Sequence, residues 1–278
     1  MTRTRLLAAL VMAPLAIAAI LLLPTEWMVA LAAVLFLAGL WEWFDLAEID
    51  DTLARTVLLV AHLGLMVAIV WASHSSIGPT LVLFQLASVI GVIWWLLALI
   101  WLGRYRFASD HDTHARVFKL AAGALSVIPA WCALAWIHAS TPNGHRWLLV
   151  ALAIVWAADT GAYFAGRKFG KHKLAPRISP NKTVEGLLGG VVAGIAIGLA
   201  VALFAGAAPA QLPAVALVAL AAVLFSVVGD LFESLLKRHA GVKDSGDLIP
   251  GHGGILDRVD GVLAALPVFA LGKAVLGF

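Results

Sequence analysis

The sequence predicts an all-α fold, a polytopic bundle of about nine transmembrane helices with its N-terminus in the cytoplasm. The first observation is composition: 62% of the 278 residues are hydrophobic and only 13% are charged, about half the charged share of a typical soluble domain. The second is that the apolar residues form continuous runs, which favours helices over an alternating β-barrel. The third is that lysine and arginine are unevenly divided between successive loops.

Each predicted span is an apolar run long enough to cross the bilayer core of roughly 30 Å. We expect spans at residues 5–23, 27–44, 56–72, 80–102, 117–138, 146–165, 184–205, 213–236 and 260–277. The first run has the basic start of a signal peptide. It continues as far as Leu23, however, which is long enough to span the membrane.

The distribution of basic residues predicts the orientation. With the N-terminus inside, 17 of the 19 lysines and arginines fall on the inner side, and only Arg146 and Lys273 fall outside. Positively charged loops stay in the cytoplasm, so this split favours a cytoplasmic N-terminus.

The inner loops also lengthen towards the C-terminus. We therefore expect residues 1–140 to be scaffold helices, with a role in dimer contact or lipid access, and residues 141–278 to be the catalytic region.

The seventh span carries glycines at four-residue spacing. Gly186, Gly190, Gly194 and Gly198 fall on one helix face, where small residues let a neighbouring helix approach closely. The pattern predicts that this helix packs deep in the bundle.

A first polar group begins in the sixth span. Asp159 lies well inside the apolar run, with Tyr163 one turn further on the same face. Acids within a membrane often mark a functional site, although a neutral aspartic acid bonded to a neighbouring helix would also explain Asp159.

The segment that leads into the seventh span suits a phosphate group. Its candidate residues are Ser179, Asn181, Lys182, Thr183 and Glu185. Backbone amides at a helix start, together with a lysine and hydroxyls, are typical of phosphate binding. Thr183 has the alternative role of a simple N-cap.

The stretch from Asp230 to Asp260 is the most polar of the chain. Asp230 and Glu233 are three residues apart, as are Asp257 and Asp260. Two such pairs offer the hard oxygen ligands that Mg²⁺ takes together with phosphate oxygens. The basic residues of the stretch that could neutralise those phosphates include Lys237, Arg238, Lys243 and Arg258. Acids for a metal and bases for phosphates indicate phosphoryl or nucleotidyl transfer.

A glycine-rich turn lies between the two acidic pairs. It contains His252, Gly253 and Gly254, and its backbone can come close to a ligand. His252 by itself has a purely structural alternative.

The order of these residues resembles the signature of the phosphatidate cytidylyltransferases, also called CDP-diacylglycerol synthases. The matching positions are Ser234, Lys237-Arg238, Lys243-Asp244, His252-Gly253-Gly254 and Asp257-Arg258-Val259-Asp260. The segments DTGAYFAGRKFGKHK and ISPNKTVEG, and the GLWEW around Glu42, also look like blocks of this family.

The resemblance implies an enzyme of phospholipid biosynthesis that converts CTP and phosphatidic acid to CDP-diacylglycerol and pyrophosphate. It also implies Mg²⁺, a monovalent cation such as K⁺ beside it, a homodimer and contact with membrane lipids; no nucleic acid is an expected partner. Asp230 and Asp257 are the first expected metal ligands, with Asp260 and Glu233 next. The four basic residues would act on the triphosphate. The expected substrate-binding residues are Ser179, Asn181, Lys182, Thr183, Glu185, Ser234, His252, Gly253, Gly254 and Asp159.

Two other functions stay open at this point. One is another CTP-dependent enzyme acting on a lipid or prenol phosphate; the other is a cation-coupled transporter, which would use Asp159 as its coupling site. The absence of an internal repeat disfavours the transporter. The short chain is also typical of a bacterial inner-membrane protein, with the active site facing the cytoplasm.

Overall fold

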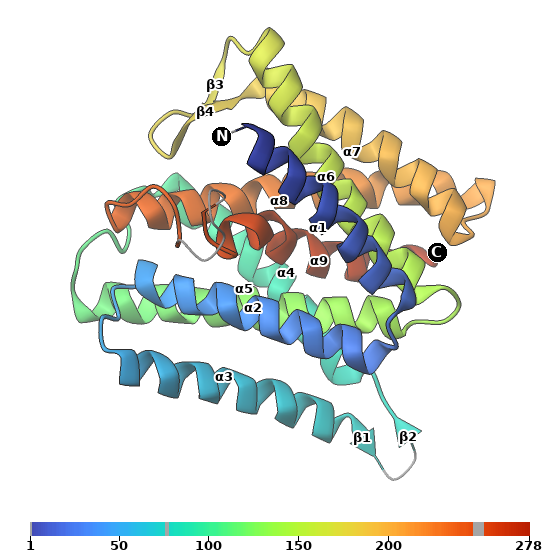
Figure 1. Ribbon diagram of the computed structural model, residues 1–278, viewed down its shortest axis with the longest axis horizontal. Coiled ribbons are helices and arrows are strands. Elements are labelled where there is room, and N and C mark those ends of the chain that lie inside the picture. The colour runs from blue at the N-terminus through green and yellow to red at the C-terminus, as the bar shows by residue number, and fades with distance from the viewer. Residues whose placement is uncertain (1, 76–77, 247–252) are drawn as a thin grey trace.

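The computed structural model describes residues 2–75, 78–246 and 253–278, and in these ranges the chain is a bundle of nine α-helices (Figure 1). The helices are α1 (Thr2–Leu22), α2 (Thr25–Leu46), α3 (Thr52–Ala72), α4 (Val82–Gly103), α5 (Thr113–Ala139), α6 (Gly144–Phe169), α7 (Val184–Ala205), α8 (Leu212–His239) and α9 (Leu256–Leu276).

Two small antiparallel hairpins and one 3-10 turn complete the fold. The elements are β1 (His74–Ser75) with β2 (Gly78–Pro79), β3 (Lys173–Ala175) with β4 (Ser179–Thr183), and η1 (Pro209–Gln211). The β3–β4 hairpin lies between α6 and α7, where the sequence predicted only a loop entering a helix. In its register Lys173 faces Thr183 and Ala175 faces Ser179.

The predicted all-α transmembrane fold is confirmed. Among the described residues, eight helices (α2 to α9) are long and apolar enough to cross a membrane, and the described apolar part of α1 is Met12–Leu22. The chain is therefore an integral, multi-pass membrane protein. The helices extend beyond the predicted spans where polar residues can continue them. For example, α5 begins at Thr113 because the Asp112 side chain accepts a hydrogen bond from the Ala115 amide at 2.7 Å.

The core of the bundle is formed where α4, α5, α8 and α9 meet. Gly91 of α4 sits against two prolines: a Cβ at this position would lie 2.6 Å from Pro129 of α5 and 3.1 Å from Pro267 of α9. Phe232 of α8 is fully buried among the rings of Trp94, Trp95 and Trp101, with centroid distances of 5.2–6.0 Å. This packing fixes the rotation of α8, and with it the direction of the acids that flank Phe232.

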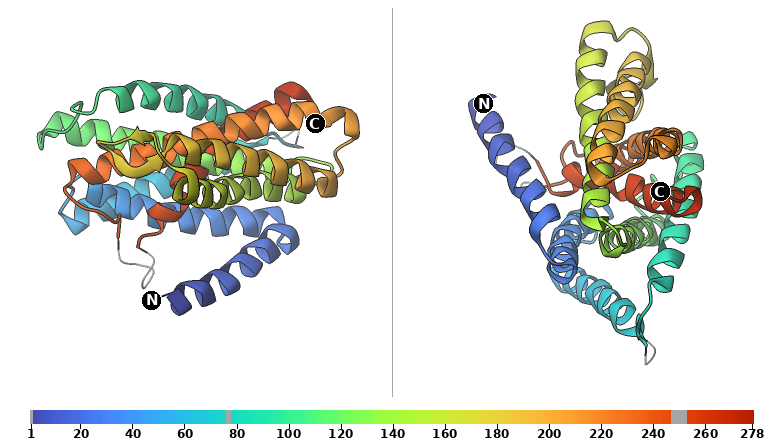
Figure 2. Two further views of the ribbon diagram at one scale, coloured as in Figure 1. Left: turned by 90° about the horizontal axis from the view of Figure 1, so that it is seen from above. Right: turned by 90° about the vertical axis from the view of Figure 1, so that its right-hand side faces the viewer.

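Helices α6 and α7 form a close pair that projects beyond the other helices (Figure 2). The glycine ridge packs closely as predicted, because all four of its glycines are buried. The expected position deep in the bundle is wrong: α7 packs mainly against α6 and α8, and Leu188, Val192 and Leu203 on its other side are exposed. A Cβ on Gly190 would lie 2.9 Å from the Ala158 carbonyl oxygen of α6, and one on Gly194 would lie 2.5 Å from Val223 of α8. The ridge thus brings the start of α7 close to Asp159 on α6.

Candidate active site

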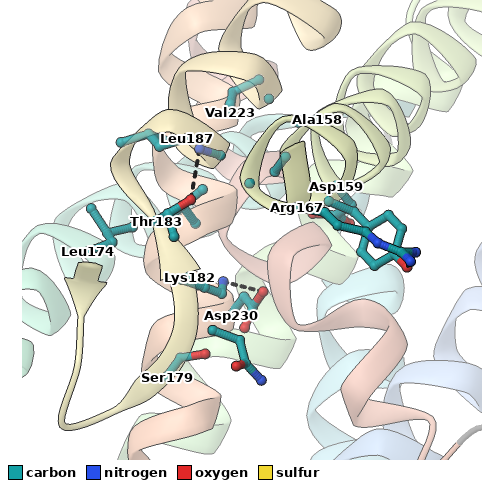
Figure 3. A pocket seen from close by; sticks show the side chains of 17 residues that line it. Ala158, Asp159, Arg167, Leu174, Ser179, Lys182, Thr183, Leu187, Val223 and Asp230 are labelled. Carbon is teal, nitrogen blue, oxygen red and sulfur yellow. Dashed lines mark hydrogen bonds and ion pairs between the residues drawn. The ribbon is translucent and has the colours of Figure 1, made fainter. Parts of the chain in front are cut away.

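A cavity of about 700 Å³ lies between α6, β4, the start of α7 and α8 (Figure 3). Most of the polar residues that the sequence singled out before residue 231 line it. The polar lining residues are Asp159, Tyr163, Arg167, Ser179, Asn181, Lys182, Thr183 and Asp230. Leu187, Val223 and Val227 give the same cavity an apolar wall. A space with both kinds of surface suits a molecule that is part phosphate and part hydrocarbon.

An ion pair between Lys182 and Asp230 crosses the cavity from β4 to α8. Both side chains are partly exposed to the cavity, so a ligand can reach them. The Ser234 hydroxyl, one turn further along α8, donates to Oδ1 of Asp230 at 3.4 Å. The lysine that was expected to bind a phosphate and the acid that was expected to bind a metal are therefore neighbours.

Thr183 ends β4 and caps α7. Its hydroxyl accepts a hydrogen bond from the Gly186 amide at 3.0 Å, which confirms the alternative N-cap role while leaving the side chain on the cavity wall. The strand, and not an open loop, presents Ser179, Asn181 and Lys182 to the cavity.

Glu185 lies outside the lining of this cavity. Its carboxylate accepts hydrogen bonds from the Lys171 amide at 3.0 Å and the His172 amide at 3.2 Å, and it lies 2.6 Å from Nδ1 of His172. Glu185 thus fastens the start of the β3–β4 hairpin to α7. Its expected role in substrate binding stays a prediction.

Helices α8 and α9 come close together beside the acids. A Cβ on Gly229 would collide with the carbonyl oxygen of Asp260, so only glycine lets the two backbones meet there. Asp260 is thereby brought beside the turn of α8 that carries Asp230, and Asp159 lines the same cavity as Asp230. Lys182 pairs with Asp230 and offsets part of the negative charge gathered there.

Asp257 is the centre of a second network, next to the first. Its Oδ1 accepts a hydrogen bond from Lys237 at 2.5 Å, and its Oδ2 accepts the amides of Ser245 at 3.1 Å and Gly254 at 3.0 Å. Lys237 also pairs with Glu233 at 2.7 Å. The Glu233 side chain is only 2% exposed, so the ionised form of its carboxylate depends on pairing with Lys237. The sequence predicted Glu233, Lys237, Gly254 and Asp257 for the site but not their pairing, and it did not single out Ser245.

The remaining predicted residues surround this network. Arg238 is exposed and donates to the Ile178 carbonyl at 3.1 Å, which ties α8 to the β3–β4 hairpin. Lys243 and Arg258 are also exposed. Gly253 has φ +79°, a conformation that strongly favours glycine. His252 lies outside the described residues.

Arg167 lines the cavity although the sequence did not single it out, and Tyr163 was noted only for sharing a helix face with Asp159. Nη1 of Arg167 donates to the Tyr163 hydroxyl at 3.1 Å. Both side chains line the cavity, and Arg167 lies on the side opposite β4 (Figure 3). The signal was present in the sequence: Asp159, Tyr163 and Arg167 are four residues apart, which places them on one face of α6. Its charge alone marks Arg167 only as one of the basic residues on the inner side.

The donor set fits a magnesium ion that is shared with a phosphate. Among the described residues, no group of three or more histidines, cysteines and acids forms a ready-made metal site. Mg²⁺ commonly takes only one or two carboxylates from a protein, because substrate phosphates and water supply its other ligands. Asp230 on the cavity wall, with Asp260 on the adjoining turn of α9, meets that requirement.

A further polar cluster lies at the same end of the bundle. The fully buried Lys119 of α5 pairs with Glu48 at 3.0 Å, and His111 lies 2.8 Å from the other Glu48 oxygen. Partial burial acts to raise the pKa of Glu48, but hydrogen bonds from His111 and Lys119 outweigh it and hold the pKa below its ordinary value. The cluster therefore loses its contribution to stability only when the pH falls through this lowered pKa.

The fold and the site together define a class: a multi-pass membrane enzyme that handles phosphate groups where its helices end. Within that class the chain belongs to the cytidylyltransferase family, whose sequence profile matches residues 3–275.

Curated relatives cover almost the whole chain. The chain is 38% identical over 270 residues to a phosphatidate cytidylyltransferase of Pseudomonas aeruginosa, covering 97% of this chain and 96% of the relative. It is 34% identical over 283 residues to the Haemophilus influenzae protein of that name, covering 97% and 98%. A Staphylococcus aureus protein, also with that name, is 37% identical over 211 residues and 76% of each chain.

Proposed function

We propose that this protein transfers the cytidylyl group of CTP to phosphatidic acid and releases pyrophosphate. The product is CDP-diacylglycerol, a precursor in phospholipid biosynthesis. The family and the names of the full-length relatives support this activity, and they give no support to a transporter. The observation that carries the proposal is the cavity itself, in which the Lys182–Asp230 pair lies close to an apolar wall.

The reaction needs no covalent intermediate on the protein. A phosphate oxygen of phosphatidic acid is already anionic, so it can attack the α-phosphorus of CTP directly. A new P–O bond forms to the α-phosphorus. The bond from the α-phosphorus to the oxygen that joins it to the β-phosphorus breaks, and pyrophosphate leaves. The protein therefore has to position two negatively charged molecules and offset their repulsion.

The basic residues supply that offset. Lys237, Arg238, Lys243 and Arg258 are assigned to the triphosphate and the departing pyrophosphate. Ser179, Asn181, Lys182 and Thr183 are assigned to one of the two substrate phosphates, and their position on the cavity wall supports this. Asp159 and Ser234 are assigned a supporting role next to Asp230. Glu185, His252, Gly253 and Gly254 remain proposed members of the site.

Magnesium is the proposed cofactor. Asp230 and Asp257 are the first proposed ligands, followed by Asp260 and Glu233, with a monovalent cation such as K⁺ as a second ion. When bound, Mg²⁺ would supply Lewis-acid stabilisation of charge on the phosphates. Asp257 is engaged by Lys237 and two amides, and Glu233 by Lys237. Asp230, which lines the cavity and is partly exposed, therefore offers the more accessible carboxylate.

The proposed location is a bacterial inner membrane, with the active site facing the cytoplasm. The bacterial relatives support the first part, and the 17 inner lysines and arginines support the second. CTP is a cytosolic substrate, which agrees with this orientation. A homodimer is proposed from the family resemblance alone.

The activity is tested in membranes that contain the protein. Incubation with CTP labelled in the cytidine, phosphatidic acid and Mg²⁺ should transfer the label to the lipid fraction as CDP-diacylglycerol, with an equal amount of pyrophosphate. Membranes without the protein are the control. Label that stays entirely in the aqueous fraction would contradict the proposal.

A further inference from the structure

Glu42 of α2 is a buried acid that reaches the start of α9. Its side chain comes from the predicted scaffold half of the chain, more than 200 residues before the helix that it contacts. It is only 3% exposed. Placing a carboxylate in such a position is costly unless several donors satisfy it.

Three donors converge on this carboxylate. Oε1 accepts the Ile255 amide at 2.9 Å, and Oε2 accepts the Leu256 amide at 2.8 Å. Oε2 also accepts the Ser245 hydroxyl at 2.9 Å. The first amides of a helix have no partner within the helix and carry partial positive charge, so they suit a carboxylate. Glu42 thus acts as an N-terminal cap for α9, supplied from another helix.

The surrounding backbone packs closely against the Glu42 carboxylate. A Cβ on Gly246 would lie 2.7 Å from Oε1 of Glu42, and a Cβ on Gly254 would collide with Oε2. Glycine at both positions lets the segments before and after residues 247–252 approach the carboxylate. One side chain of α2 therefore contacts the chain on both sides of residues 247–252.

Glu42 is linked to Asp257 through Ser245. The Ser245 hydroxyl donates to Glu42, and the amide of the same residue donates to Oδ2 of Asp257. Asp257 also lies in the first turn of α9, the helix start that Glu42 fixes. The position of Asp257 relative to Lys237 therefore depends on Glu42 along two routes.

We propose that Glu42 is a positioning residue for the transfer reaction, which holds Asp257 and the Gly253–Gly254 turn in place from the N-terminal half. This inference rests on the proposed function. It assigns no direct contact between Glu42 and either substrate.

The first test is kinetic. Glu42→Gln keeps the size of the side chain but leaves one oxygen where three donors need two, so at least one donor loses its partner. We expect kcat to fall by about 10-fold or more, since small displacements of reacting groups are costly, and we expect this fall to exceed any change in the two KM values. The control is Asp45→Asn, which removes an exposed carboxylate three residues further along α2.

The second test measures the restraint itself and needs no turnover. Hydrogen exchange of the purified protein should show faster exchange in peptides containing Ile255 and Leu256 in Glu42→Gln than in the wild type. Peptides from α6 and α7 should be unchanged. Asp45→Asn, which weakens an ion pair with Arg55, should exchange like the wild type at Ile255 and Leu256.

The outcomes separate the two proposals. A wild type that makes no CDP-diacylglycerol would contradict the proposed function, while the exchange result would still report on Glu42. Normal kcat in Glu42→Gln, or unchanged exchange at Ile255 and Leu256, would overturn the positioning role. Ser245→Ala removes one of the three donors and replaces Glu42→Gln if that variant does not accumulate in the membrane. Wild-type kcat and exchange in Ser245→Ala would then overturn the positioning role.

Discussion

At the level of single residues, Asp257 connects three separate segments of the chain. It pairs with Lys237 of α8 and accepts hydrogen bonds from the amides of Ser245 and Gly254, which lie on either side of residues 247–252. The charged form is therefore the form that the surroundings stabilise. Its loss would disturb chemistry more than folding, because Lys237 keeps a second partner in Glu233.

Asp257→Asn is expected to lower kcat by about 100-fold or more, the range seen when a charge-stabilising group is lost from an active site. The protein should still insert and fold, which a melting curve in detergent would show. The matched control is Asp110→Asn, because Asp110 is an exposed aspartate in the loop between α4 and α5. Near-normal turnover in Asp257→Asn would refute its assignment to the site.

Lys182→Ala is expected to raise the apparent KM of one substrate more than it lowers kcat. The lysine lies on the cavity wall and pairs with Asp230, so its removal takes away positive charge that a bound phosphate would meet. Steady-state kinetics with CTP and phosphatidic acid varied in turn would show which substrate is affected. Unchanged KM values for both would exclude Lys182 from binding.

At the level of secondary-structure elements, the α6–α7 interface decides whether the cavity can exist. Gly161 of α6 faces α7 so closely that a Cβ would lie 2.5 Å from the Cβ of Ala193 and 2.7 Å from the Gly189 carbonyl oxygen. Small residues at such a crossing let helices associate in lipid by close packing. The same closeness places β4 opposite the Asp159 face of α6.

Gly161→Ala is expected to destabilise the protein by about 1–3 kcal/mol, the usual cost of an added methyl group in a packed interior. Gly64→Ala on α3 is the matched control, because a Cβ there meets nothing within 4 Å. That change should be neutral or stabilise by up to about 1 kcal/mol through the better helix propensity of alanine. Denaturation in a fixed detergent measures both, and equal effects would contradict the packing argument.

At the level of the whole molecule, the two halves of the chain contribute to one site. α9 packs against α2, α4 and α5 as well as α8, and Glu42 reaches from the N-terminal half to the start of α9. Residues 1–140 therefore contribute at least one contact to the support of the site, beyond the general scaffold role that the sequence predicted for them.

The orientation of the whole bundle gives a further prediction. Lys171 and Ala210 are both exposed, and they lie at opposite ends of α7, whose 22 residues span about 33 Å. A membrane-impermeant thiol reagent should label Ala210→Cys in intact cells stripped of their outer membrane. It should label Lys171→Cys only after permeabilisation. The single native Cys132 is buried and gives a low background; the reverse labelling pattern would refute the cytoplasmic site.

The sequence alone was sufficient to predict the helices, because the bilayer imposes strong local constraints on the backbone. A long apolar run has to satisfy its backbone internally, so residues 184–205 had to form a helix, and its bounds agree with α7. The acids and bases of the site were also recognisable, since charge is rare in this chain and costly near a membrane. These are properties of composition and spacing, which a single sequence contains.

The partners of each charge depended on tertiary structure. Spacing placed Asp230 and Glu233 on one helix face, yet Asp230 faces Lys182 in the cavity, whereas Glu233 is buried against Lys237. The contact from Glu42 to Ser245 and α9 joins residues more than 200 positions apart. Such pairings follow from how the helices cross and rotate, which local propensity and periodicity do not encode. The sequence thus determined which residues carry the chemistry, and the packing of the helices determined which of them act together.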